Sequence, residues 1–325
     1  ISEWIPLSQL HPPEGQGVLA LTFRKGDPRL TPLRALFVHA VRFVGAGCGR
    51  AGLCTLDGLA ALERADVCLY DALIPADLLD RLPPRVRRLD VGKRAGHHGA
   101  TQADICAQLV DLAREGLRVV RLKGGDAGLF GRLAEELAAL DALDLPYTVI
   151  PGVSSLAAAT TGTGLLLTRR DTAHGFRVTT PRRAGGAQYN VADTGTPGGE
   201  LLVLFMAAQA AADVRRDLLA AGWPAATPAA AVTRAGAPDE QVRHAHLAEL
   251  AVLAAAGLNE PDDAPALLIV GDAARHAYPP RGALRGQRVL ITFSATMQAA
   301  ALERVRDLGG IPIGRPLVRL VPRVE

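Results

Sequence analysis

The 325-residue sequence has little of several things, and each scarcity excludes a class of protein. Aromatic residues make up only 4% of the chain, which is too few for the base-stacking surfaces of a single-strand nucleic-acid binder. The four cysteines, Cys48, Cys54, Cys68 and Cys106, form no C-x-x-C pair, so we predict neither a zinc nor a redox motif and no metal site. The closest approach to a long apolar run, residues 201–212, is shorter than the roughly 18 residues of a membrane-spanning helix.

An excess of charge of one sign is also missing, because 36 lysines and arginines stand against 33 aspartates and glutamates. The net charge of +3 is not the concentrated basic field of a nucleic-acid binder, so we expect a small-molecule partner, with no nucleic acid and no membrane. Only Lys25, Lys93 and Lys123 are lysines, which makes a lysine stronger evidence of a role than an arginine. The chain begins without a basic-then-apolar leader, and we expect a cytoplasmic protein with reduced cysteines.

Apolar residues are abundant, at 49% against 21% charged residues, and the length suits two domains of ordinary size. Short apolar runs alternate with amphipathic stretches, which is typical of an α/β sheet covered by helices. The predicted strands are residues 41–44, 67–70, 117–122, 147–150, 176–179, 201–205, 229–233, 266–270 and 288–292, and the predicted helices are residues 55–64, 101–115, 133–143, 209–221, 247–256 and 297–308.

The Pro151-Gly152 pair interrupts this alternation and divides it into two predicted α/β domains, residues 41–150 and 151–279. Residues 1–40 and 280–325 are predicted N-terminal and C-terminal extensions. Neither extension is long enough to bury a core alone.

Two predicted strands end in glycine-rich loops, GAGCGRAG at residues 45–52 and KGGD at residues 123–126, where a backbone can turn sharply and approach a ligand. The motif Gly47-x-Gly49-x-x-Gly52 matches a dinucleotide fingerprint, and Asp71 follows near the spacing of an acid that binds a ribose. However, the match starts two residues after the strand ends, and a dinucleotide fold does not need the second glycine loop. A tight turn without a ligand is a further interpretation of the first loop.

Longer blocks resemble the tetrapyrrole (precorrin-type) methyltransferases, which use S-adenosylmethionine. The matching stretches are VRFVGAGCGRAGLCTLDGLAALERADVCLYDALI, VGKRAGHHGATQADICAQLVDLAREGLRVVRLKGGDAGLFGR, LPYTVIPGVSSLAAATTGTGLLLTRRD, LLVLFMAA and PALLIVG. They follow the order of the family over about residues 41–275. Within the family they are most similar to the enzymes that methylate uroporphyrinogen-III.

The resemblance implies an α/β fold of two domains of the tetrapyrrole methyltransferase type, with the active site in the cleft between them, and a homodimer. It also implies the C-methylation of uroporphyrinogen-III to precorrin-2, which feeds siroheme or cobalamin synthesis. Three alternatives stay open at this point: a methyltransferase for a later precorrin, a nicotinamide-dependent oxidoreductase built on the first glycine loop, and an inactive remnant.

S-adenosylmethionine would lie folded in that cleft and leave as S-adenosylhomocysteine. Gly124 and Gly125 let the backbone approach the cofactor, and the Asp126 anion suits its hydroxyls or amine. We expect the two glycine-bearing strand ends to hold it from opposite sides of the interdomain gap. The residues that the resemblance places at the cofactor are Cys48, Gly124, Gly125, Asp126, Leu129, Ser154, Ser155, Met206, Ala235 and Ala266.

Asp71 and Lys93 are the candidate acid–base pair. Positioning accounts for most of the acceleration of a direct methyl displacement, but the substituted macrocycle must then lose and rearrange protons. By resemblance Asp71 accepts the proton and Lys93 supplies one, whereas taken singly a strand-end cap and a surface charge are the simpler interpretations. Uroporphyrinogen-III carries eight carboxylates, which favours a pocket lined by arginine. The expected substrate contacts are Arg94, Arg121, Arg132 and Arg169.

The chain departs from the family pattern at Cys48 and Arg50, where GAGCGR replaces GAGPGD, and at Ala127, where GGDAGLFGR replaces GGDPFVFGR. The missing prolines leave the loops less preorganised, and Arg50 inverts a charge at the mouth of the cleft. Residues 11–37 resemble a short piece of porphobilinogen deaminase, and residues 282–322 resemble the opening of uroporphyrinogen-III synthase. These flanks indicate a fused or rearranged gene.

Overall fold

The computed structural model describes residues 29, 38–92, 101–170, 173, 175–181, 201–238, 240–255, 266–275, 278 and 281–317. Most of the predicted N-terminal extension lies outside these residues. Among the described residues, no helix combines the length and the apolar character that crossing a bilayer requires.

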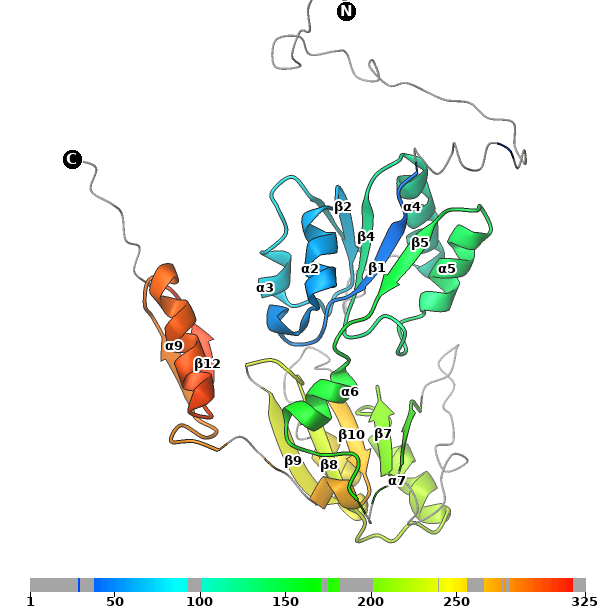
Figure 1. The fold of residues 1–325 in the computed structure, drawn as a ribbon. Helices are drawn as coiled ribbons and strands as arrows, with labels where there is room; N and C mark the ends of the chain where they lie inside the picture. Colours follow the sequence, from blue (N-terminus) through cyan, green and yellow to red (C-terminus); the bar gives the residue numbers. More distant parts are fainter. Residues whose placement is uncertain are drawn as a thin grey trace, which may run out of the picture.

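The first sheet is parallel throughout, in the order β3-β2-β4-β1-β5 (Figure 1). Helices cover both of its faces, and the apolar side chains of its three central strands alternate between two cores. Its elements are β1 (Val41–Gly45), β2 (Val67–Tyr70), β3 (Arg87–Asp90), β4 (Val119–Lys123) and β5 (Tyr147–Ile150), with η2 (Ala51–Leu53), α2 (Leu56–Glu63) and α3 (Ala76–Leu79) on one side and α4 (Gln102–Arg114) and α5 (Leu133–Asp141) on the other.

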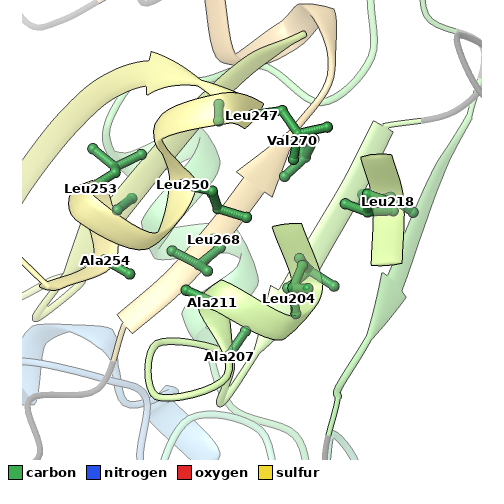
Figure 2. Packing of buried hydrophobic residues seen from close by; sticks show 14 of the residues in the cluster. Leu204, Ala207, Ala211, Leu218, Leu247, Leu250, Leu253, Ala254, Leu268 and Val270 are labelled. Carbon is green, nitrogen blue, oxygen red and sulfur yellow. The ribbon is translucent and has the colours of Figure 1, made fainter. Parts of the chain in front are cut away.

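The second sheet is mixed, in the order β6-β7-β10-β8-β9, and only β6 and β7 run parallel. Its strands are β6 (Phe176–Thr179), β7 (Leu201–Phe205), β8 (Pro228–Thr233), β9 (Gln241–His246) and β10 (Ala266–Val270). One face packs on α7 (Ala211–Ala220), η6 (Leu247–Glu249) and α8 (Leu250–Ala255), and Figure 2 shows Leu204 and Leu268 of the sheet among leucines of these helices.

The opposite face of the second sheet packs on the segment that leaves the first domain. This segment forms α6 (Ser155–Ala157) and the π-helical turn η3 (Ala158–Gly162), and the short helix η7 (Asp272–Arg275) lies beside it. Cys48 and Leu53, from the loop after β1, pack against the same core. A loop of the first domain therefore touches the second.

The predicted α/β class is confirmed, and most predicted elements lie where the apolar runs placed them. The sequence missed β3 and β9, which are edge strands of mostly polar residues without an apolar run, and the short α3, α6 and η3. In the C-terminal segment, β11 (Arg288–Ile291) and α9 (Ala295–Asp307) match predicted elements. β12 (Ile311–Gly314), which pairs in parallel with β11, was not predicted.

Candidate functional site

The carboxyl ends of β1 and β4 meet in a backbone contact between two glycines. The Gly47 N–H donates to the Gly125 carbonyl oxygen at 3.1 Å, and the Gly125 N–H donates to the Gly47 carbonyl oxygen at 2.8 Å. Both glycines have positive φ, 71° and 65°, and a Cβ on Gly47 would lie 2.2 Å from the Leu53 carbonyl oxygen. Because β1 and β4 are neighbouring parallel strands, both loops belong to one edge of the first sheet. The expectation that they face each other across the interdomain gap is wrong.

The Asp126 carboxylate ties the second glycine loop to the connection between the two sheets. Its Oδ1 accepts a hydrogen bond from the Gly128 N–H at 2.8 Å, and its Oδ2 accepts one from the Gly152 N–H at 3.0 Å. The backbones here are in close contact, since a Cβ on Gly152 would lie 2.3 Å from the Gly125 carbonyl oxygen. Asp126 therefore shapes the loop, while its oxygens keep further lone pairs for a ligand.

Ser154 and Ser155 lie directly beside the second glycine loop. A Cβ on Gly125 would come within 3.6 Å of the Ser155 nitrogen and 3.8 Å of the Ser154 Cα. The Ser154 hydroxyl caps α6 by accepting a hydrogen bond from the Leu156 N–H at 3.1 Å. Gly124 borders open space, because among the described residues a Cβ there would approach only Leu73, at 3.6 Å.

The candidate residues of the second domain lie along one edge of its sheet. Met206 directly follows β7, Ala235 lies two residues beyond β8, and Ala266 begins β10. Since β10 is antiparallel to β7 and β8, its first residue lies at the edge where those strands end. Met206 has a φ of 52° and is 43% exposed, whereas Ala235 and Ala266 are each only 7% exposed.

Two contacts join the candidate edges of the two sheets. The loop containing Cys48 and Gly49 packs backbone to backbone on residues 235–237, where a Cβ on Gly49 would lie 2.2 Å from the Ala237 nitrogen and one on Gly236 would lie 2.7 Å from the Cys48 carbonyl oxygen. Phe130 and Phe205 form the second contact, with ring centroids 4.9 Å apart. The glycine loops therefore lie close to the second domain.

Burial at the first contact, together with the smaller effect of the Glu240 charge, raises the pKa of the Cys48 thiol to about 11 against the opposing charge of Arg50. Burial also raises the pKa of Glu240, whose carboxylate accepts a hydrogen bond from the Gly236 N–H at 2.7 Å. The Arg50 charge lowers the pKa of Glu240. The Arg50 charge therefore interacts electrostatically with the Glu240 carboxylate, and Cys48 stays a neutral thiol at neutral pH.

Asp71 directly follows β2, and its side chain is 32% exposed. Its Oδ1 accepts a hydrogen bond from the Arg121 Nη2 at 2.6 Å. Arg121 itself is only 2% exposed, and its Nε also donates to the Glu136 Oε2 at 3.0 Å. The prediction that Arg121 contacts the substrate is therefore corrected, because its guanidinium is enclosed and engaged by two carboxylates.

The other predicted basic residues differ in how far the structure describes them. Arg132, at the start of α5, is exposed and pairs with Glu135 at 2.6 Å, and Arg169 is exposed with its backbone bonded to Ala173. Lys93 and Arg94 lie outside the described residues. Leu129 is 40% exposed, like its neighbour in the Phe130–Phe205 contact.

Lys123 and Glu136 belong to the buried surroundings of Asp71, and sequence reasoning assigned neither of them. The Lys123 Nζ donates to the Glu136 Oε1 at 2.7 Å. Glu136 lies on the apolar face of α5, three residues after Leu133 and four before Leu140. Two features of the sequence could have indicated these residues. Glu136 is an acid on an apolar helix face, and Lys123 is one of only three lysines in the chain.

The dinucleotide alternative does not fit this geometry. In a dinucleotide fold the acid follows the strand adjacent to the first one, but here β4 lies between β1 and β2. The helix that should open at the glycines also starts late, since η2 intervenes and α2 begins at Leu56. Asp71 is therefore separated from the first glycine loop by β4, and it is hydrogen-bonded to Arg121.

Comparison with known proteins gives a consistent result. The family model described as tetrapyrrole (corrin/porphyrin) methylases matches residues 40–251. A siroheme synthase of Serratia proteamaculans is 40% identical over 233 residues, which cover 71% of this chain and 48% of the relative, and one of Pectobacterium atrosepticum is 42% identical over 71% of this chain and 47% of the relative. The chain therefore spans about half the length of the curated relatives it matches.

Solved structures match over the same region. The uroporphyrin-III C-methyltransferase of Thermus thermophilus, crystallised with S-adenosyl homocysteine, has a TM-score of 0.61 and 34% identity and covers 73% of this chain and 99% of that chain. A cobalt precorrin-4 methyltransferase has a TM-score of 0.63 and 25% identity and covers 72% of this chain and 95% of that chain.

Proposed function

Because the chain belongs to the tetrapyrrole methylase family, we propose that it transfers methyl groups from S-adenosylmethionine to ring carbons of uroporphyrinogen-III, giving precorrin-2 for siroheme or cobalamin synthesis. The observation that carries the proposal is the Gly47–Gly125 bridge, which brings two glycine loops together beside the second domain. A structural relative with 34% identity, crystallised with the product of such a cofactor, supports it.

The surfaces at these strand ends fit such a cofactor. Leu73, Leu129, Phe130 and Met206 are each at least 40% exposed, an apolar rim suited to an adenosine and a thioether. The open side of Gly124 lets the backbone approach a ligand. When bound, S-adenosylmethionine supplies an electrophilic methyl group on sulfur. The residues proposed to hold it are Cys48, Gly124, Gly125, Asp126, Leu129, Ser154, Ser155, Met206, Ala235 and Ala266.

The proton transfers are assigned to residues of this chain. The Asp71 carboxylate, at the exposed end of its ion pair, accepts the proton that the macrocycle loses after one of its ring carbons has been methylated. Lys93 is proposed as the donor, and Arg94, Arg132 and Arg169 are proposed to bind the carboxylates of the macrocycle. Arg121 is not among them, because it is buried.

The proposal extends to the setting of the enzyme. We place the two methyltransferase domains at residues 41–150 and 151–279 and take the protein as a cytoplasmic homodimer. The four cysteines are free thiols, which supports a reducing compartment. The N-terminal and C-terminal extensions are proposed to derive from a porphobilinogen deaminase-like and a uroporphyrinogen-III synthase-like gene.

Calorimetry with S-adenosylhomocysteine, beside NADH, tests the cofactor. A Gly124→Val variant should lose S-adenosylhomocysteine binding, because Gly124 has room for a side chain only where the ligand would lie. Gly52→Val is the matched control, since a Cβ at that exposed glycine would approach only the Arg50 side chain, at 3.9 Å. Binding of NADH alone, or unchanged affinity in Gly124→Val, would contradict the proposal, and binding of neither compound would favour an inactive remnant. Methyl transfer from labelled S-adenosylmethionine to uroporphyrinogen-III then tests the substrate against later precorrins.

A further inference from the structure

Four charged side chains form one connected set at the carboxyl ends of β2 and β4. Glu136 is at its centre: its Oε2 accepts from the Arg121 Nε at 3.0 Å, and its Oε1 accepts from the Lys123 Nζ at 2.7 Å and the Arg121 Nη2 at 3.3 Å. The same Arg121 Nη2 donates to the Asp71 Oδ1 at 2.6 Å. Two carboxylates therefore balance two cations.

Burial divides this set sharply. The side chains of Arg121, Lys123 and Glu136 are 2%, 3% and 1% exposed, whereas that of Asp71 is 32% exposed. Among the described residues, the Asp71 Oδ2 has no hydrogen-bond partner. Arg121 therefore binds one oxygen of this carboxylate, and the other remains available to a ligand. The set therefore presents one carboxylate to the candidate site.

The geometry of Arg121 explains how that carboxylate is held. Its planar guanidinium donates from Nε and Nη2 to Glu136 and from Nη1 to the Leu122 carbonyl oxygen at 3.2 Å. The Gln102 Nε2, on α4, fixes the Glu136 Oε1 further at 3.1 Å. A lysine could not form this fork, because its ammonium is a single point of charge.

A gain in folding stability does not by itself explain why these charged side chains are buried together. Buried ion pairs often contribute little, since desolvation offsets their attraction, and well-packed apolar residues can replace them without loss. The burial of Glu136 would by itself raise its pKa, but the charges of Arg121 and Lys123 outweigh that effect and lower it. Glu136 therefore stays ionised at neutral pH, and Asp71, the exposed member of the set, has a fixed partner in Arg121.

We propose that Arg121 is a positioning residue that fixes the Asp71 carboxylate at the mouth of the site, while Glu136 and Lys123 hold Arg121 in place. The inference rests on the proposed function, because the placement of Asp71 affects turnover only if this carboxylate accepts a proton. The set also reaches the second glycine loop: Lys123 immediately precedes Gly124, and its carbonyl oxygen accepts a hydrogen bond from the Ala46 N–H at 2.8 Å. The charged side chains thus support the proton acceptor, while the backbone of Lys123 joins the two glycine loops.

A double-mutant cycle in kcat tests the proposal. Arg121→Lys keeps the charge and loses the fork, and it should lower kcat about 10- to 100-fold while the Kd of S-adenosylhomocysteine stays within about three-fold. Asp71→Asn should lower kcat about 100-fold or more. The double variant should be no slower than Asp71→Asn alone, because Arg121 acts through Asp71.

Arg118→Lys is the matched control, since Arg118 forms an ion pair with Asp66 at the opposite end of the same two strands. Its kcat should stay within about two-fold of the parent. If Arg121→Lys slows Asp71→Asn as much as it slows the parent, the positioning role is wrong.

A second variant serves if Arg121→Lys does not fold. Lys123→Met with Glu136→Gln keeps the set neutral overall and removes the group that holds Arg121, and it should reproduce the loss of kcat with S-adenosylhomocysteine binding retained. Retained kcat would overturn the proposal.

If the parent protein transfers no methyl group, the proposed function is overturned instead. The thermal unfolding of the parent, the two single variants and the double variant then tests whether Arg121 positions Asp71. The Tm shifts of Arg121→Lys and Asp71→Asn should fail to add if Arg121 holds this carboxylate. Additive shifts would overturn it.

Discussion

Two arginine–aspartate pairs connect β2 to β4, one at each end of the same two strands. At the amino end, Arg118 donates from its Nε and Nη2 to both oxygens of Asp66, and the two side chains are 48% and 32% exposed. At the carboxyl end, Arg121 binds only one oxygen of Asp71 and directs the rest of its guanidinium to Glu136. In the exposed pair both oxygens of Asp66 bind the arginine, whereas in the buried pair one oxygen of Asp71 does not.

The difference follows from where a parallel sheet places its ligands. Loops at the carboxyl ends of the strands form the site in open α/β sheets, and here both glycine loops follow such ends. A charged pair at the amino end contributes to the surface, while one at the carboxyl end lies beside the ligand. An arginine–aspartate pair therefore has a different role at each end of the strands: it belongs to the surface at the amino end and to the candidate site at the carboxyl end.

The removal of a carboxylate that binds each arginine should distinguish the two ends of the strands most strongly. Glu136→Ala leaves Arg121 and Lys123 buried without their shared partner and should lower the free energy of unfolding by about 3–5 kcal/mol. Asp66→Ala, at the exposed pair, should cost at most about 1 kcal/mol. Urea unfolding of the two variants measures both values, and equal losses would contradict the distinction.

A wholly apolar replacement of the buried set should separate stability from turnover. Arg121→Met, Lys123→Met and Glu136→Leu together should keep the free energy of unfolding within about 2 kcal/mol of the parent, because no charge is left unpaired in the core. Methyl transfer should still fall about 100-fold, since Asp71 loses its fixed partner. Calorimetric unfolding and turnover of one preparation give both numbers, and a stable variant with normal turnover would leave the buried charges without a role.

Sequence reasoning located the glycine loops but could not place them relative to each other. The loops follow the first and fourth strands of the sheet, and only the strand order makes those strands neighbours. Local sequence patterns carry no information on the strand order, so the Gly47–Gly125 bridge could not be predicted from them. The edge strands β3 and β9 were missed for a related reason, since their polar residues give no apolar run.

The error at Arg121 has a definite cause. The predicted strand, residues 117–122, contains Arg121, as β4 does, but the arginine adjoins the KGGD motif and for that reason is expected to contact the substrate. Side chains alternate along a strand, so Arg121 shares the face of Val119 and points toward the helices that carry Glu136 and Gln102. An arginine next to a binding motif was assigned to the ligand, but its position in the strand assigns it to the core.

The exposed pair should respond to pH in a predictable direction. The Arg118 guanidinium lowers the pKa of Asp66 from 3.8 to about 2, so the folded state favours the ionised carboxylate. Its stabilising effect is complete above the unfolded value and is lost as the pH falls through about 2. The difference in unfolding free energy between the parent and Asp66→Asn should be at most about 1 kcal/mol at pH 6 and should shrink as the pH falls to 3. A difference that grows on acidification would contradict this sign, and 1 M NaCl should reduce it at pH 6 because the pair is exposed.

Glu240 is the opposite case and should give the smallest effect. Burial at the interdomain contact raises its pKa above 4.5, so the folded state disfavours its ionised form and stability decreases as the pH rises through the folded pKa. Glu240→Gln removes that charge while an amide oxygen can still accept the Gly236 N–H, and it should raise Tm by about 1–2 °C at pH 8 and leave it unchanged at pH 4. Glu303→Gln, on the exposed face of α9, is the control that should shift neither value. A lower Tm for Glu240→Gln at pH 8 would mean that the attraction of Arg50 exceeds the cost of burial, and the charge inversion at Arg50 would then be what stabilises the contact between the domains.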